Sequence, residues 1–334
     1  MKSILASDGN RLFLVYPEST LQQLEACAGL NRSAVMTSRN LEALRPLLAD
    51  VEVIFSTWGM PALTEEQIAD YLPNLKEIYY SAGSVQFFAR PFLARGVRIF
   101  SAWAANGVPV VEFALSQILL ANIGYYQASR YQSMGELEKA RAAANGFPGN
   151  YDVKVGILGA GMIGSMLIEK LHDYHVEVLV YDPFLSDERA AALGVRKASL
   201  EEIFTECQTI SNHIANNAQT VGMLNYESCF KYMKDNATFI NTGRGAQVVE
   251  DDLVRVLQEK PNATAVLDVT WPEPPVAGHP FYSLPNVFLT PHMAGSTGNE
   301  VHRMSLYMLE EYKRVHSGQA PLYEVTEDML ARMA

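Results

Sequence analysis

The chain has 334 residues, 49 % of them hydrophobic and 19 % charged, which is enough for two globular domains with full cores. Its formal net charge is −11, and no cluster of lysines and arginines offsets this acidity. We therefore do not expect the protein to bind nucleic acid or anionic membranes. The first residues are too poor in apolar side chains for a secretory signal, and the three cysteines have no metal-like spacing. We therefore expect a cytoplasmic protein with reduced thiols in its core and no bound metal.

Short apolar runs alternate with helical patterns over the first hundred residues. Strands are predicted at residues 11–16, 51–56, 75–80 and 97–100, and helices at about 19–29, 64–72 and 86–95. This alternation predicts a parallel sheet with helices on both faces. Because no glycine fingerprint occurs in this part, we do not expect it to bind a nucleotide.

A long apolar helix is predicted next, with Asn106 as its N-cap and Pro109 in its first turn. From Val108 to Tyr126 the pattern is apolar on nearly all sides, but charged and amide residues interrupt it, so we expect a buried helix and not a membrane span. One face can be buried by its own domain, and the remainder needs a second domain or a second subunit. A more polar helix at about 134–144 and a loop at 145–150 follow.

The most informative stretch has the order strand, glycine turn, helix, strand, acid. The apolar run from Val153 to Leu158 ends in Gly159-Ala160-Gly161-Met162-Ile163-Gly164, and a second apolar run, 176–181, ends in Asp182. This is the order of a dinucleotide site. The first glycine would allow the tight turn, the second the approach of the pyrophosphate, and the third close packing of helix and strand. The helix N-terminus would hold the pyrophosphate and Asp182 the adenosine ribose, so NAD is the expected cofactor.

The alternation then resumes. Short strands are predicted at residues 209–212, 238–241, 263–268 and 287–289, and a long amphipathic helix at about 297–316. The tail, 318–334, has few apolar residues, and we expect it to lie back over the first domain.

Three polar residues follow three of these strands: Arg244, Glu273 and His292. Ligands bind at the carboxyl ends of the strands of an open α/β sheet, so we expect the three to converge. An arginine can hold a carboxylate or polarise a keto oxygen, and a histidine can exchange a proton with an alcohol. A glutamate can orient the imidazole and favour its protonated form. Each residue alone is more often a surface or loop residue, but together, after a dinucleotide fingerprint, they indicate an active site.

These motifs resemble those of the D-isomer-specific 2-hydroxyacid dehydrogenase family over nearly the whole chain. The matching segments are the glycine motif, Tyr181-Asp182-Pro183, Ile240-Asn241-Thr242-Gly243-Arg244-Gly245, Leu267-Asp268-Val269 with Glu273-Pro274, and Pro291-His292. The resemblance implies two doubly wound α/β domains. A Rossmann NAD-binding domain, residues 104–296, would be inserted into a flavodoxin-like substrate domain made of 1–103 and 297–334.

The resemblance also implies roles for individual residues. Arg244, Glu273 and His292 would be catalytic. Cofactor contacts would come from Gly159, Gly161, Met162, Ile163, Gly164, Asp182, Thr242, Gly243, Asp268 and Gly295. The implied reaction moves a hydride between the nicotinamide and C2 of a small 2-keto or D-2-hydroxy acid, in a homodimer formed through the NAD-binding domain.

Two segments depart from the family pattern. The family's Gly-Ala-Gly-Val-Asp-like loop, whose backbone amides hold the substrate carboxylate, reads Ser81-Ala82-Gly83-Ser84-Val85-Gln86 here, and we expect Gly83 and Ser84, with Arg244, to bind substrate. The segment His213-Ile214-Ala215-Asn216-Asn217 lacks the family's proline. Trp58 and Trp103 are unusual residues with no assigned role.

Two alternatives share the fold. A formate dehydrogenase would carry Gln where this chain has Glu273. A nucleotide-sensing binding protein, like the C-terminal-binding co-repressors, would keep the three catalytic residues, but the acidic, compact chain argues against it.

Overall fold

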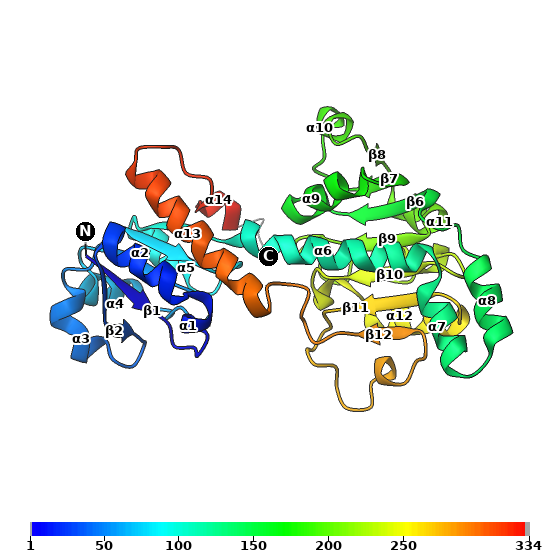
Figure 1. The fold of residues 1–334 in the computed structure, drawn as a ribbon, viewed down its shortest axis with the longest axis horizontal. Coiled ribbons are helices and arrows are strands. Elements are labelled where there is room, and N and C mark those ends of the chain that lie inside the picture. Colours follow the sequence, from blue (N-terminus) through cyan, green and yellow to red (C-terminus); the bar gives the residue numbers. More distant parts are fainter. Residues whose placement is uncertain (1, 331–334) are drawn as a thin grey trace. The chain divides into compact units, whose positions relative to one another are not determined.

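The computed structural model describes residues 2–330, and the chain divides into two compact units. The first comprises Met1–Gly107 and Ser296–Ala334, and the second Val108–Gly295. Each unit contains its own sheet flanked by helices (Figure 1). The predicted class, two doubly wound α/β domains, is confirmed by the strand orders described below.

The sheet of the first unit has the order β13-β5-β4-β3-β1-β2. Its strands are β1 (Ser3–Ala6), β2 (Leu30–Met36), β3 (Val53–Ser56), β4 (Glu77–Tyr80), β5 (Arg98–Ser101) and β13 (Glu324–Val325). All neighbours are parallel except β13 and β5, which are antiparallel, so the sheet is not wholly parallel as predicted. The order 2-1-3-4-5 of the first five strands is that of flavodoxin-like domains.

Helices cover both faces of this sheet: α1 (Leu12–Val15), α2 (Glu18–Ala28), α3 (Leu41–Leu48), α4 (Glu65–Tyr71), α5 (Ala89–Ala94), α13 (Val301–His316) and α14 (Glu327–Leu330). The start of α4 shows how local sequence sets a boundary. Thr64 Oγ1 accepts from the Gln67 amide at 3.2 Å, and Gln67 Oε1 accepts from the Thr64 amide at 3.0 Å. This reciprocal capping fixes the helix at that residue.

The predicted strand at residues 11–16 is wrong, because Leu12–Val15 form the one-turn helix α1. The first strand is instead Ser3–Ala6, which pairs with both β2 and β3 and is fully buried. β2 was also not predicted. A strand-like composition such as that of residues 11–16 forms a strand only where a neighbouring strand is available to pair, and β1 already occupies the place between β2 and β3.

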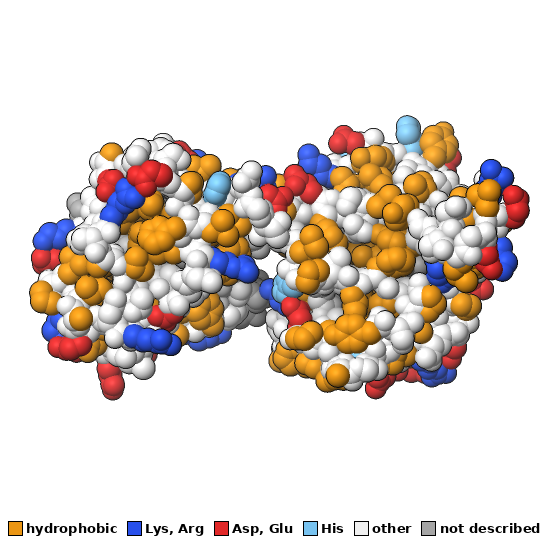
Figure 2. All heavy atoms as spheres, turned by 60° about the horizontal axis from the view of Figure 1, so that its bottom comes forward, with side chains coloured by type: hydrophobic (Ala, Val, Ile, Leu, Met, Phe, Trp, Pro, Cys, Tyr) orange, Lys and Arg blue, Asp and Glu red, His pale blue; other side chains and the backbone are white. Residues whose placement is uncertain are grey.

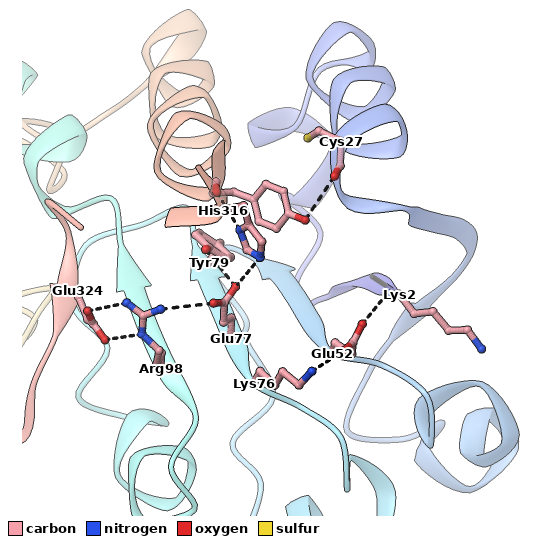
Figure 3. Close-up of polar contacts among 10 residues, drawn as sticks. Lys2, Cys27, Glu52, Lys76, Glu77, Tyr79, Arg98, His316 and Glu324 are labelled. Carbon is pink, nitrogen blue, oxygen red and sulfur yellow. Dashed lines mark hydrogen bonds and ion pairs between the residues drawn. The ribbon is translucent and has the colours of Figure 1, made fainter. Parts of the chain in front are cut away.

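The described part of the C-terminal tail lies on the first unit, as predicted; residues 331–334 lie outside the described residues. Figure 3 shows the polar contacts that hold it. The Arg98 guanidinium donates to both carboxylate oxygens of Glu324, at 2.8 and 2.9 Å, and lies 3.5 Å from Glu77. His316, at the end of α13, is 3.5 Å from Glu77 as well. Arg98 therefore joins the tail strand to the sheet, and the buried Glu77 links Arg98 to α13.

The second unit has a seven-stranded sheet of order β12-β11-β10-β9-β6-β7-β8, with every pair parallel. Its strands are β6 (Tyr151–Leu158), β7 (His175–Tyr181), β8 (Arg196–Lys197), β9 (Thr209–Asn212), β10 (Thr238–Asn241), β11 (Thr264–Leu267) and β12 (Val287–Leu289). This is the Rossmann order: β7 and β8 extend the sheet on one side of β6, and β9 to β12 extend it on the other, so the strand order reverses between β6 and β9. The predicted strands at 209–212, 238–241 and 287–289 are confirmed to the residue.

Besides α6 (Trp103–Asn122), most of which lies in this unit, its helices are α7 (Tyr125–Ser133), α8 (Leu137–Asn145), α9 (Met162–Leu171), α10 (Asp187–Ala192), α11 (Leu200–Glu206) and α12 (Glu250–Glu259). The single-turn 3-10 helices η1 (Phe230–Tyr232), η2 (Gly245–Gln247) and η3 (Pro280–Tyr282) lie in its loops, and η4 (Gly298–Glu300) precedes α13 in the first unit.

The long apolar helix α6 runs from Trp103 to Asn122, so its predicted start is wrong. The Asn106 amide already donates to Ala102 O at 3.0 Å, and both Asn106 and Pro109 lie inside the helix. The helix also stops earlier than predicted, because Gly124 adopts a left-handed conformation (φ +71°) before α7 begins. By length and composition α6 is the one described helix that could cross a membrane, a test that core helices of globular proteins also pass.

Two of the three thiols match the expectation of core cysteines. Cys207 and Cys229 are buried, and burial raises the pKa of each thiol to about 12. Cys27 is exposed on the outer face of α2, so the expectation is wrong for this residue. On the face shown in Figure 2, side chains of both charges are interspersed among hydrophobic and neutral ones.

Candidate active site

The glycine turn joins β6 to α9 in the second unit. Gly159 has φ +90°, and a Cβ there would lie 2.9 Å from His213 O. A Cβ on Gly164 would lie 2.0 Å from Gly159 O. Both glycines are therefore required by the chain itself, the first for the turn and the other for close packing.

Gly161 is different. Its φ of −65° is open to any residue, and a Cβ there would meet no described atom within 4 Å. Neither backbone conformation nor packing within residues 2–330 explains a glycine at this position. A ligand that approaches the backbone would explain it, so this turn fits a dinucleotide pyrophosphate.

The start of α9 supplies the donors for such a ligand. The first intrahelical bond runs from the Ser165 amide to Gly161 O at 2.9 Å. The amides of Met162, Ile163 and Gly164 precede it and belong to the unpaired first turn, where the helix dipole favours an anion.

Asp182 lies at the end of β7, beside the glycine turn. Its Oδ2 accepts from the Ala160 amide at 2.8 Å, and its Oδ1 accepts from the Phe184 amide at 2.8 Å. Each carboxylate oxygen has two acceptor sites, so both still have capacity for ribose hydroxyls. The acid therefore shapes the turn at the position where the sequence predicts ribose recognition.

The sequence prediction missed Arg189 on α10. Its Nη2 donates to Ala160 O at 2.8 Å and to Ser165 Oγ at 2.9 Å, which places a guanidinium at the glycine turn. The only sequence signal was its position shortly after Asp182.

Asn212 and Asn241 end the neighbouring strands β9 and β10, and their side chains form a buried amide network with Gln247. Asn212 Nδ2 donates to Asn241 Oδ1 at 3.0 Å and to Gln247 Oε1 at 2.7 Å. A Cβ on Gly243 would lie 3.0 Å from Asn212 Nδ2, so this glycine allows the loop to pack on the network. Thr242 Oγ1 is buried with no hydrogen-bond partner among residues 2–330, which suits the cofactor contact predicted for it.

Arg244 follows in the same loop and is partly buried. Its Nη1 donates to Gly243 O at 2.8 Å. Burial lowers the pKa of Arg244, and the nearby negative charge of Glu273 opposes this. A Cβ on Gly245 would lie 2.0 Å from the carbonyl carbon of Thr270, so the arginine loop lies directly against the loop that leads to Glu273.

His292 Nδ1 lies 2.7 Å from Glu273 Oε1. A carboxylate only accepts, so Nδ1 carries the proton and Nε2 is left for a substrate. Both side chains are nearly half exposed, at 48 % and 42 %. The structure thus brings together the three residues predicted to be catalytic, all within the second unit.

Asp268 holds the loop that presents His292. It is buried, and it accepts from Thr290 Oγ1 at 2.6 Å and from the Met293 and Ala294 amides at 2.8 and 2.9 Å. His292 itself has φ +53°, an unusual conformation for a residue with a side chain. Asp268 therefore stabilises that conformation. Contacts of Asp268 and Gly295 with the cofactor remain predictions.

The segment that lacks the family's proline begins with His213. Burial lowers the pKa of His213 to about 4, and its Nε2 lies 2.8 Å from Ser211 Oγ. Its carbonyl packs against Gly159. His213 is therefore a neutral residue that supports the glycine turn.

The predicted carboxylate loop lies in the first unit, after β4. Gly83 and Ser84 are partly exposed. The carbonyls of the residues that precede them, Ala82 and Gly83, both accept from Ser101 Oγ. Trp58, after β3, has the Arg11 guanidinium 5.4 Å from its ring centroid. Trp103 packs edge-on against Tyr323 at 6.0 Å.

Fold and site together define a dinucleotide-binding α/β protein with an Arg-Glu-His set at the same edge of the sheet as the glycine turn. A family model described as D-isomer specific 2-hydroxyacid dehydrogenase, NAD binding domain, matches residues 115–294, more than half of the chain. The chain belongs to this family, and its second unit is the NAD-binding domain.

Relatives agree with this assignment. The D-3-phosphoglycerate dehydrogenase of Archaeoglobus fulgidus is 29 % identical over 67 % of this chain and 42 % of its own length. The formate dehydrogenase of Neurospora crassa is 30 % identical over 75 % of this chain and 69 % of its own length. The chain thus spans less than half the length of the archaeal relative.

Solved structures match the whole fold. A phosphoglycerate oxidoreductase from Rhizobium etli has a TM-score of 0.81, with 22 % identity over 98 % of this chain and 99 % of its own. The apo D-mandelate dehydrogenase of Rhodotorula graminis has a TM-score of 0.79, with 20 % identity over 98 % and 97 %. At these identities the likeness concerns the fold alone.

Proposed function

We propose that this protein is an NAD-dependent D-2-hydroxyacid dehydrogenase that reduces 2-keto acids and oxidises 2-hydroxy acids. The observation that carries the proposal is the 2.7 Å contact between His292 Nδ1 and Glu273 Oε1. The negative charge of Glu273 also acts on the pKa of the nearby Arg244. Carbonyl reduction needs a proton donor and a group that stabilises negative charge on oxygen, and these residues supply both. Family membership supports the same reaction.

Each residue has a separate role. The nicotinamide supplies or accepts the hydride. Arg244 binds the substrate carboxylate and keto oxygen and stabilises the charge that develops on that oxygen. His292 donates a proton from Nε2 during reduction and accepts it during oxidation, while Glu273 fixes the ring orientation. In the first unit, the Gly83 and Ser84 amides bind the substrate carboxylate.

The test is turnover of NADH with a panel of 2-keto acids that differ in side chain. We expect reduction of at least one of them, and a loss of about 10²- to 10⁴-fold in kcat/KM in His292→Gln. His175→Gln is the matched control, because His175 is an exposed histidine of the same unit on β7. NADH binding without turnover of any 2-keto acid would contradict the proposal and favour a nucleotide-sensing binding protein, which the dehydrogenase relatives do not favour.

Formate oxidation is a second candidate, because one relative is a formate dehydrogenase. That reaction moves a hydride without placing a proton on oxygen, so the Glu273–His292 pair would have no proton to transfer. Formate with NAD⁺ belongs in the same panel. Faster turnover of formate than of every 2-hydroxy acid would replace the first proposal.

We also propose a homodimer formed through the NAD-binding domain. Support comes from large apolar side chains that are exposed on the segment from the end of α6 to the start of α8: Ile123, Tyr125, Met134 and Leu137. Where such side chains form one contiguous surface, that surface is a candidate interface. Sedimentation should give a dimer for the wild type and a monomer for Tyr125→Asp, whereas Leu322→Asp, at an exposed leucine of the first unit, should leave the dimer intact.

A cytoplasmic location fits the three free cysteines.

A further inference from the structure

A buried serine donates to two consecutive carbonyls of the loop after β4. Ser101, the last residue of β5, is fully buried, and its Oγ lies 2.9 Å from Ala82 O and 2.6 Å from Gly83 O. Its single proton is shared between the two carbonyls, since a hydroxyl has one donor. Two consecutive peptide groups are thus turned toward the same side chain.

The start of the loop is fixed separately. Thr57 Oγ1 donates to Ser81 O at 2.7 Å, and Tyr16 Oη lies 2.7 Å from Ser81 Oγ. Thr57, Tyr16 and Ser81 are all buried. Ser101 therefore acts on a loop whose entry is already anchored, and its effect is confined to the next two peptides.

The amides turn the opposite way. In a trans peptide the N–H points opposite to the preceding carbonyl, so the amides of Gly83 and Ser84 both point away from Ser101. Neither amide donates to any acceptor within residues 2–330. Successive amides directed to one side form a concavity that binds anions, and this one lies at the carboxyl end of a parallel strand, where ligands bind.

We propose that Ser101 is a positioning residue that preorganises the Gly83 and Ser84 amides for the substrate carboxylate. This inference rests on the proposed function and adds to it a residue that does not touch the substrate. The carboxylate keeps its charge throughout the reaction, so its binding is the same in the ground state and the transition state. Loss of Ser101 should therefore raise KM and leave kcat nearly unchanged.

The experiment compares Ser101→Ala, Ser101→Thr and Ser305→Ala. Ser305 is the matched control, a buried serine on α13 whose Oγ donates to His302 O at 3.0 Å. Ser101→Ala should raise the KM for the keto acid about tenfold or more, with kcat within about threefold and NADH affinity unchanged. Ser101→Thr keeps the hydroxyl and should restore most of the affinity, and Ser305→Ala should behave as the wild type.

A second measurement does not depend on turnover. Oxamate, a small carboxylate, is titrated into wild type labelled with ¹⁵N-glycine and ¹⁵N-serine, with and without NADH, and its Kd is measured for each variant. We expect shifts of the Gly83 and Ser84 amide resonances and a Kd about tenfold higher in Ser101→Ala. This readout decides the inference even if the wild type reduces no 2-keto acid, which would refute only the proposed function.

The inference is overturned if oxamate leaves both amide resonances unmoved in the wild type, or if Ser101→Ala binds it with unchanged Kd. A fall in kcat at constant KM would also overturn it. If Ser101→Ala does not fold, the wild-type resonances alone decide.

Discussion

Replacing Gly161 by alanine should separate ligand binding from folding. The side chain would enter space that no described atom occupies within 4 Å, at a φ of −65° that alanine adopts freely. The folded protein can therefore accommodate the methyl group without a steric clash. A dinucleotide bound at the turn would clash with it, because the methyl would occupy the surface where the pyrophosphate approaches the backbone.

The expected change in stability is small. Alanine restricts the unfolded chain and stabilises the fold by about 0.4–1 kcal/mol. Gly161 is also the N-cap of α9, where alanine is less favourable than glycine by a similar amount. The two effects oppose each other, so the free energy of unfolding should stay within about 1 kcal/mol of the wild-type value.

The expected change in affinity is large. Displacing the pyrophosphate from the amides at the start of α9 loses at least one hydrogen bond to a charged group, about 1.5–3 kcal/mol. The Kd for NADH should therefore rise about 10- to 150-fold.

The assay combines fluorescence titration of NADH with urea unfolding. Gly164→Ala is the opposite case, because its Cβ would lie 2.0 Å from Gly159 O, and we expect it to destabilise the fold. Gly146→Ala, where the nearest contact is an ordinary 3.4 Å, should leave NADH affinity unchanged and change the free energy of unfolding by no more than about 1 kcal/mol. If Gly161→Ala binds NADH as tightly as the wild type, the nucleotide does not lie on this turn. If it loses stability and affinity together, the glycine is structural.

Four further predictions follow from the site. Arg244→Lys keeps the charge but loses the planar fork, so KM for the keto acid should rise and kcat should fall while the Kd for NADH stays the same; wild-type kcat/KM would mean that Arg244 is structural. Gly245→Ala would drive a Cβ to 2.0 Å from the Thr270 backbone, so urea unfolding should show a loss of about 3 kcal/mol, and an unchanged midpoint would contradict the loop packing. Burial lowers the pKa of His213 from 6.5 to about 4, so as the pH falls the histidine takes up a proton in the unfolded chain before it does so in the folded protein. The free energy of unfolding should therefore fall by up to about 3 kcal/mol between pH 6.5 and pH 4. Unfolding curves of His213→Gln should lack this component, and the same pH dependence in wild type and variant would refute the role of His213. Asp182→Asn removes the negative charge that repels the 2′-phosphate of NADPH, a repulsion of about 1–4 kcal/mol at a separation near 4 Å, and it leaves the Arg189 guanidinium at the turn. The ratio of NADPH to NADH turnover should therefore rise about tenfold or more. An unchanged ratio would mean that Asp182 does not face the ribose.

Several features of this protein are local in sequence, and these were predictable. The order of strand, glycine turn, helix, strand and Asp182 requires only neighbouring residues, and the structure forms it with Gly159 and Gly164 in the expected positions. Arg244, Glu273 and His292 each follow a short apolar run. Because parallel strands align their carboxyl ends, the convergence of these residues could be expected from the sequence alone.

Other features depend on partners that are distant in the chain. The segment 11–16 has a strand-like composition, but Ser3–Ala6 occupies the place between β2 and β3, and only the sheet decides which segment pairs. The start of α6 could not be located from Asn106 and Pro109, because the helix begins at Trp103 despite the proline inside it.

The same division applies within the site. The sequence by itself determined the glycine turn, its acid, and the three polar residues at the strand ends, because each follows from a pattern of neighbouring residues. Only the tertiary structure decided that Asp268 holds the His292 loop, that Arg189 reaches the glycine turn, and that Ser101 orients the Gly83 and Ser84 amides. Each of these contacts joins segments whose separation in the chain carries no periodic signal, and its geometry exists only once the strands have paired.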